Sequence, residues 1–231
     1  MNSDLFVIEN GVLTDHNISS ETEANLVIPQ EVFAIKENLF RGYTNIKSVI
    51  LPDRLTYIAE AAFQSCTALS SIEIPGSVKA IGGLAFEYCE GLQFAILKDG
   101  VENVGYAAFQ NCNNLQAVSL PDSVKEIGEG AFSSCDSLQS IIIPGSVKTI
   151  PEGMLSLCSS LQSVIVREGV EAIEAEAFSF CGSLQTVILP KSVKEIAEDA
   201  FADCEAPTLK APAGSYAEAY AAKMNLDFEA L

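Results

Sequence analysis

The sequence is poor in histidine, tryptophan and basic residues. It contains one histidine, no tryptophan, and 13 Lys and Arg against 31 Asp and Glu, so the formal net charge is -18. A surface this acidic repels phosphate, which argues against nucleic acid and against anionic membrane surfaces as partners. The sequence also lacks any run of 18 apolar residues, so no membrane span is predicted. The scarcity of acid–base groups argues against an enzyme.

A period of 23 residues dominates the sequence. The seven cysteines follow one another at this interval, a phenylalanine precedes most of them by three positions, and a leucine follows most of them by three. Self-similarity at such a period is typical of a solenoid, in which each repeat packs only against its neighbours. The cysteines are Cys66, Cys89, Cys112, Cys135, Cys158, Cys181 and Cys204, and the phenylalanines are Phe40, Phe63, Phe86, Phe109, Phe132, Phe178 and Phe201, with Leu155 at the missing place.

One repeat, residues 112–134, shows how a turn of the solenoid is expected to fold. Alternation at 118–120 is that of a strand, and strands of successive repeats are expected to form a parallel ladder about 4.8 Å apart. Ile127, Ala131 and Cys135 are spaced by four, which places them on one face of a short helical turn. Parallel crossovers are overwhelmingly right-handed. The sequence therefore predicts an α/β repeat fold, a right-handed solenoid of 23-residue units with short parallel strands and short helical turns.

Both ends of such a solenoid need caps, because a terminal repeat lacks a neighbour on one side. Asn10-Gly11 between apolar runs predicts a hairpin near the start. Ser215 and Glu218 form a capping box that predicts a helix near the end. The resulting division is a hairpin-like N-terminal cap at 1–19, eight 23-residue repeats over 20–203, and a C-terminal cap at 204–231 with a helix at about 215–224.

The repeat unit also resembles a known family. The pattern C-x-x-L-x-x-[IV]-x-[IL]-P-x-S-V-K-x-I-x-x-x-A-F is similar to that of the BspA-like leucine-rich-repeat proteins of bacterial surfaces, and F-V-I-E-N-G-V-L and P-A-G-S-Y-A-E-A-Y look like the family's two caps. The resemblance implies a leucine-rich-repeat solenoid used as a binding surface, often on the cell exterior, with no catalytic motif. The first residues do not form a signal peptide. Two locations therefore stay open: secreted or cell-surface if a leader was removed, and cytoplasmic otherwise.

The cysteines invite a metal or a disulfide interpretation. Metal sites need ligands clustered as C-x-x-C or combined with histidines, and a spacing of 23 gives neither. Stacked cysteines of adjacent repeats could come within disulfide range, but their side chains point the same way and their number is odd. We interpret them as a buried ladder of free thiols that behave as small hydrophobes. No metal and no cofactor is predicted.

The other groups with possible chemistry receive structural interpretations. His16 lies in a polar loop and is expected to be solvated, because nothing near it in sequence supplies a nucleophile and an orienting acid. Gly76 and Gly145 open Gly-Ser-Val-Lys segments that only superficially resemble a phosphate loop, and we assign them to turns. One acidic row is expected to be solvated, in the first turn of each helical piece where negative charge suits exposed N–H groups. Its members are Glu37, Glu60, Glu129, Glu152 and Glu198.

One row of apolar residues has no evident role in the core. Strand alternation points these residues away from the interior, where β-propensity alone could favour isoleucine, or where a contiguous apolar patch could mark a partner site. We choose the partner site, formed by Ile50, Phe94, Ile96, Ile142, Ile165 and Ile188. The predicted function is a non-enzymatic leucine-rich-repeat binding module for protein–protein interaction or adhesion. The alternative is a structural spacer or self-associating assembly unit without a specific ligand. The predicted partner is another protein or a second copy of the chain, and its identity does not follow from the sequence. The sequence also does not decide between a protein and a carbohydrate ligand.

Overall fold

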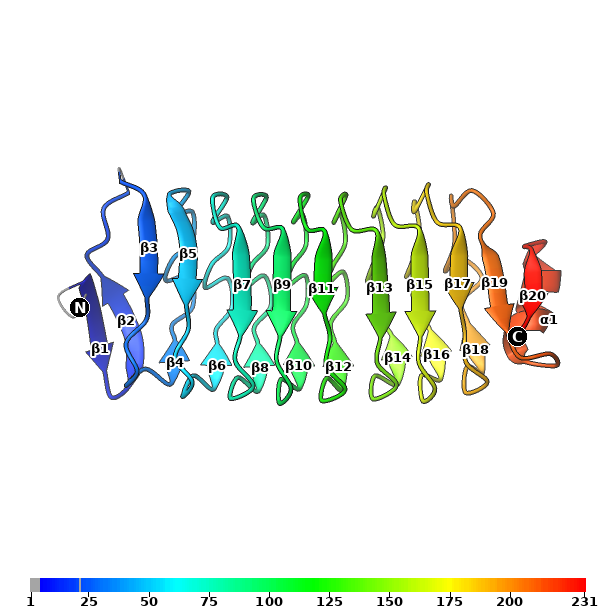
Figure 1. The fold of residues 1–231 in the computed structure, drawn as a ribbon, viewed down its shortest axis with the longest axis horizontal. Helices are drawn as coiled ribbons and strands as arrows, with labels where there is room; N and C mark the ends of the chain where they lie inside the picture. The colour runs from blue at the N-terminus through cyan, green and yellow to red at the C-terminus, as the bar shows by residue number, and fades with distance from the viewer. Residues whose placement is uncertain (1–4, 21) are drawn as a thin grey trace.

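The computed structural model describes residues 5–20 and 22–231 as an elongated solenoid with the two chain ends at opposite tips (Figure 1). It has about nine turns of about 23 residues each. Eight successive turns each contribute one longer strand and one short strand, from β3 and β4 to β17 and β18, and the turns stack so that equivalent residues follow one another along the long axis. The parallel-strand solenoid expected from the 23-residue period is therefore confirmed.

The longer strands form a parallel ladder along one face. Their pairing joins β3 to β5, β7 through β9 to β11, and β13 through β15, β17 and β19 to β20. In β13 the residues alternate between exposed and buried, as expected for a strand with one face in the core. The strands are β3 (Ala24–Val27), β5 (Ile46–Ile50), β7 (Ser71–Ile74), β9 (Phe94–Leu97), β11 (Ala117–Ser119), β13 (Ser140–Ile143), β15 (Ser163–Val166), β17 (Thr186–Ile188), β19 (Thr208–Ala211) and β20 (Phe228–Ala230).

A second parallel ladder consists of strands of only two residues. Each of its members buries one aliphatic residue and turns the other toward the surface. The strands are β4 (Ala34–Ile35), β6 (Tyr57–Ile58), β8 (Ala80–Ile81), β10 (Asn103–Val104), β12 (Glu126–Ile127), β14 (Thr149–Ile150), β16 (Ala172–Ile173) and β18 (Glu195–Ile196).

Each end of the solenoid carries an element that differs from the repeats. At the N-terminal end β1 (Phe6–Glu9) and β2 (Val12–His16) pair antiparallel, and β2 continues in parallel to β4. At the C-terminal end α1 (Tyr216–Met224) begins after Ser215 and stops at Asn225, which has left-handed backbone angles. Glu218 accepts a hydrogen bond from the Gly214 N–H at 2.6 Å, one residue earlier than a standard capping box requires. The exact bounds of the caps and of the eight repeats stay a prediction.

The predicted helical turns are wrong, because α1 is the only α-helix within the described residues. Between the short strand of one turn and the longer strand of the next, the chain forms a run of tight turns. The N–H groups of Ala131 and Ser133 donate to the carbonyl three residues earlier, whereas those of Gly130, Phe132 and Ser134 donate to carbonyls of the next turn of the solenoid. Three of these five backbone hydrogen bonds are therefore made between turns, so the segment cannot form in an isolated repeat.

The phenylalanine row forms a stack of rings along the core. Consecutive rings from Phe40 to Phe132 have centroids 5.0–5.4 Å apart and interplanar angles of 2–16°, and all of these rings are fully buried. Leu155 interrupts the stack, which resumes with Phe178 and Phe201 at 5.1 Å. Offset-stacked aromatic pairs add about 0.5–1.5 kcal/mol beyond their buried area. The row therefore belongs to the core, as predicted.

The prediction for His16 is wrong. His16 is the last residue of β2, and its ring stacks on Phe40 with centroids 5.0 Å apart, so it closes the phenylalanine stack at the N-terminal end. Its Nε2 lies 3.1 Å from the Leu39 carbonyl oxygen, and its Nδ1 accepts a hydrogen bond from the Ile18 N–H. The sequence could not show this because the partners lie in the next turn. His16 is thus a packing residue.

Candidate interaction surface

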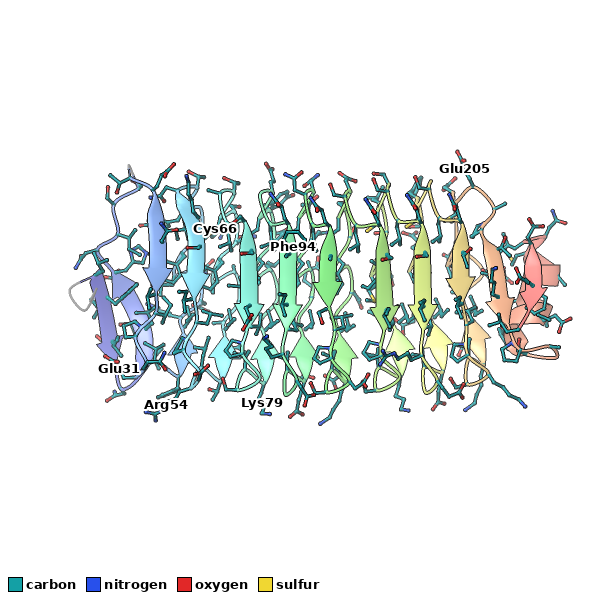
Figure 2. All side chains as sticks on the ribbon, in the orientation of Figure 1. Glu31, Arg54, Cys66, Lys79, Phe94 and Glu205 are labelled. Atoms are coloured by element: carbon teal, nitrogen blue, oxygen red, sulfur yellow. The ribbon has the colours of Figure 1, made fainter. Side chains whose placement is uncertain are left out.

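The predicted partner residues lie on the outer face of the longer-strand ladder. We call Ile50, Phe94, Ile96, Ile142, Ile165 and Ile188 the isoleucine stripe. Figure 2 shows Phe94 on β9 over the middle of this face. The residues that flank a stripe residue on its own strand point the other way and are buried, as Ile141 and Ile143 do on either side of Ile142. The strand faces were therefore assigned correctly.

The C-terminal part of the stripe is continuous. Ile142, Ile165 and Ile188 are paired in register on β13, β15 and β17, so their side chains lie side by side on three consecutive strands. Ile142 and Ile165 are 45% and 39% exposed. Ile188 is less exposed, and the next residue in the row is Lys210, whose side chain forms a salt bridge with Glu229. The open apolar surface here is thus centred on Ile142 and Ile165.

Elsewhere the stripe is interrupted by polar residues. Ile96 and Phe94 are both exposed on β9, but Glu73 and Ser119 occupy the positions on either side of Ile96. A salt bridge joins Lys98 to Glu73 at 3.4 Å, and both groups are exposed, so it contributes little to stability. The structure therefore divides the predicted stripe into separate apolar patches.

The N-terminal patch contains one residue that the sequence interpretation missed. Ile50 is 59% exposed and is paired in register with Val27 of β3, which is also exposed. The missed signal was the period itself, because Val27 lies 23 residues before Ile50. Beside Ile50 is a hollow of about 270 Å³, lined by Val49, Ile50, Leu51, Asp53, Glu73 and Pro75.

The cysteine ladder is buried and free, as interpreted from the sequence. Cys66 to Cys181 are buried and Cys204 is partly exposed, and none of them forms a disulfide. Each Sγ donates a hydrogen bond of 3.0–3.3 Å to the carbonyl oxygen 26 residues earlier, which belongs to the phenylalanine row or to Leu155. The thiols therefore link consecutive turns of the solenoid. Groups of acidic, cysteine or histidine side chains able to hold a metal are absent from the described part of the chain.

Burial also controls the acidity of the thiols. It raises the pKa of Cys66 and of Cys158 to about 12, and it raises the pKa of Cys135 as well. Cys204 differs, because the neighbouring Cys181 side chain lowers the pKa of Cys204, and the pKa of Cys181 is raised in turn. A raised pKa means less thiolate at a given pH, and the thiolate is the nucleophile. Because Cys204 is also the only one of the seven that is not fully buried, we expect it to be the most reactive thiol.

A bulky maleimide at neutral pH should accordingly label native protein at Cys204 and leave the six buried thiols unmodified. Mass spectrometry of the labelled chain checks the stoichiometry. In denaturant all seven thiols should react, and Cys204→Ser should remove the native-state reaction. Rapid labelling of Cys112 or Cys135 in the native protein would contradict their place in the core.

The acidic row is exposed, but it is not held at helix starts. Glu37, Glu60, Glu129, Glu152 and Glu198 all lie at the surface in the run of turns. Only Glu198 has an ion-pair partner among the described residues, Lys223 of α1 at 2.5 Å, which lowers the pKa of the Glu198 carboxyl. The row is exposed to solvent, as expected. The expected interaction with helix N-termini is wrong, because the predicted helical turns are not helices.

Comparison with known proteins identifies the type of repeat. The family described as BspA type Leucine rich repeat region matches residues 18–101 and 81–208. No curated protein matches the chain significantly. Because the two matched segments together cover most of the chain, they are sufficient to assign the family.

Solved structures agree with this assignment. A leucine rich cell surface protein from Faecalibacterium prausnitzii is 30% identical, with a TM-score of 0.55; the match covers 84% of this chain and 61% of that one. The leucine rich repeat protein of T. pallidum is 27% identical, with a TM-score of 0.73 and coverage of 80% and 90%. The present chain therefore spans less than two thirds of the first relative. It belongs to the BspA-type leucine-rich-repeat family.

Proposed function

We propose that the chain is a non-enzymatic recognition module that binds another protein through the isoleucine stripe. The observation that carries this proposal is the exposed pair Ile142 and Ile165, which lie in register on adjacent strands where the fold requires no apolar side chain. Contiguous exposed apolar surface is typical of interaction sites. Leucine-rich repeats are generally protein-interaction modules, which supports the same interpretation.

The charge distribution along this face favours a specific site over general adhesiveness. Arg167 reaches across an intervening turn to Asp122 at 2.9 Å, beside the strands that carry the apolar pair. Such exposed ion pairs add little stability, but charged groups around an apolar centre select partners and orient them. An apolar centre with a polar rim is the usual organisation of a protein–protein interface.

We further propose that the module acts on the cell exterior, as the F. prausnitzii relative, described as a cell surface protein, suggests. None of the helices in the described residues is long and apolar enough to cross a membrane.

The double substitution Ile142→Thr with Ile165→Thr tests the proposed surface. Threonine keeps the β-branch and hence the strand preference, so the free energy of unfolding should change by less than about 1.5 kcal/mol. Binding to a partner recovered from the producing cells should weaken by roughly tenfold or more, as expected when central contacts of an interface are truncated. Calorimetry of the wild-type and variant chains with that partner measures the loss.

Tyr106→Thr is the matched control, because Tyr106 is exposed in the run of turns that follows β10, outside the longer-strand ladder that carries the stripe. It should leave binding unchanged. Sedimentation of the purified chain tests the alternative function, self-association. A wild-type oligomer that the double substitution converts to monomers would favour an assembly unit. A double variant that binds normally but loses stability severely would show that the stripe is core.

A further inference from the structure

The run of turns contains one position that requires left-handed backbone angles in every repeat. At this position φ lies between 57° and 77° from Gly42 to Asp203. Bulky residues are rarely found in this region, whereas asparagine and aspartate are enriched there. The occupants along the solenoid are Gly42, Ser65, Tyr88, Asn111, Ser134, Leu157, Phe180 and Asp203.

Two adjacent turns place large apolar side chains at this unfavourable position. Leu157 and Phe180 are 49% and 52% exposed. They occupy equivalent places in turns joined by backbone hydrogen bonds, since the Leu157 N–H donates to the Ser179 carbonyl at 2.8 Å. Their neighbours in the row, Ser134 and Asp203, show that a short polar residue fits the same backbone.

Neither packing nor backbone preference accounts for these two residues. The side chains add nothing to the core, because they are half-exposed, and their backbone angles are costly for leucine and phenylalanine. Strain retained where the fold could avoid it is a reason to look for function. We call Leu157 and Phe180 the turn-edge patch.

The charge around this patch has one sign. Between residues 60 and 208 the run of turns contains no lysine or arginine, because every basic residue of that range lies in or between the two strands of a turn. Figure 2 shows the consequence, with Glu205 at one edge of the solenoid and Arg54 and Lys79 at the opposite edge. Asp203 follows Phe180 in the row, and Glu176 lies on the same run; both are exposed.

We propose that the turn-edge patch is a second interaction surface, which binds a basic amphipathic segment of a partner protein. Apolar side chains of the segment would cover Leu157 and Phe180, and its lysines or arginines would face the acidic residues around them. Charge complementarity of this kind steers association and selects the partner. The site is separate from the isoleucine stripe, so either surface can fail without the other.

The test uses the full chain and a synthetic peptide of alternating leucine and lysine, with fluorescence anisotropy as the readout. Leu157→Ser with Phe180→Asn introduces residues that other repeats carry at this position. It should weaken peptide binding by about tenfold or more while leaving the net charge unchanged. Tyr88→Ser is the matched control, an exposed aromatic at the same position in a distant turn, and should change binding by less than about twofold.

The remaining outcomes also decide the proposal. The double variant should unfold at the same temperature as the wild type or higher, because it relieves backbone strain. Unchanged peptide binding by the double variant would mean attraction to net charge alone and would overturn the proposal. Equal binding of a leucine–glutamate peptide, a marked fall in unfolding temperature, or a wild-type dimer that the double variant dissociates would overturn it as well.

Discussion

Replacing Phe132 by alanine is expected to lower the free energy of unfolding by about 3–5 kcal/mol. The ring is fully buried and stacks on Phe109 with centroids 5.4 Å apart, so alanine would leave a cavity between two turns. On the other side lies Leu155, where the aromatic row is interrupted, so the Phe132 ring stacks on another phenylalanine on one side only. Because a solenoid is stabilised by the interfaces between neighbouring repeats, the loss should weaken both interfaces of the turn.

Urea unfolding followed by circular dichroism measures this effect. Phe94→Ala is the matched control, because it removes the same side chain from the outer face, where Phe94 is 43% exposed. Exposed substitutions away from structural features usually change stability by no more than about 0.5 kcal/mol. A Phe132→Ala midpoint equal to that of Phe94→Ala would show that the phenylalanine row is not the core.

The repeated side chains could be predicted because they report the stacking directly. A residue type that returns every 23 positions must meet its own copies in adjacent turns, so the rows through Phe132 and Cys135 had to share one environment. Strand alternation likewise predicts that Ile142 lies at the surface and Ile141 in the core, where the structure places them. These inferences needed only the period and the pleat.

The connecting backbone could not be predicted in the same way. A spacing of four between Ile127, Ala131 and Cys135 places all three inside, as observed, but a helix and a run of tight turns satisfy that spacing equally well. The left-handed residues that distinguish the two are mostly not glycine, so composition gives no warning. The turn-edge patch was missed for this reason, because its unusual backbone is visible only in three dimensions.

The candidate site shows a similar division. The sequence identified the exposed isoleucines, but whether neighbours in a row touch depends on pairing between strands. Ile142 and Ile165 are paired in register, whereas Ile96 has polar residues on either side. The prediction for His16 was wrong for the same reason, since the Leu39 carbonyl and the Phe40 ring that hold it in the core lie 23 or more residues away in sequence.

The glycines of the Gly-Ser-Val-Lys segments were assigned to turns, but the structure adds a second requirement for them. A Cβ on Gly145 would lie 1.8 Å from the carbonyl oxygen of Glu168 in the next turn. A Cβ on Gly169, where φ is +114°, would in turn lie 2.3 Å from the Gly145 oxygen. Two backbones therefore approach closely here, and neither contact involves a side chain that could move aside.

Gly145→Ala is consequently expected to lower the free energy of unfolding by about 1–3 kcal/mol or more, because overpacking must separate the two backbones. Gly182→Ala is the matched control: a Cβ there meets nothing within 4 Å, and the equivalent residues Asn113, Asp136 and Ser159 already carry one. That control should be neutral or stabilise by about 0.4–1 kcal/mol, since alanine reduces the entropy of the unfolded chain. Parallel urea titrations compare the unfolding midpoints of the two variants. Equal midpoints would mean that the turns can move apart at Gly145 without cost, and that their close backbone contact does not stabilise the stack.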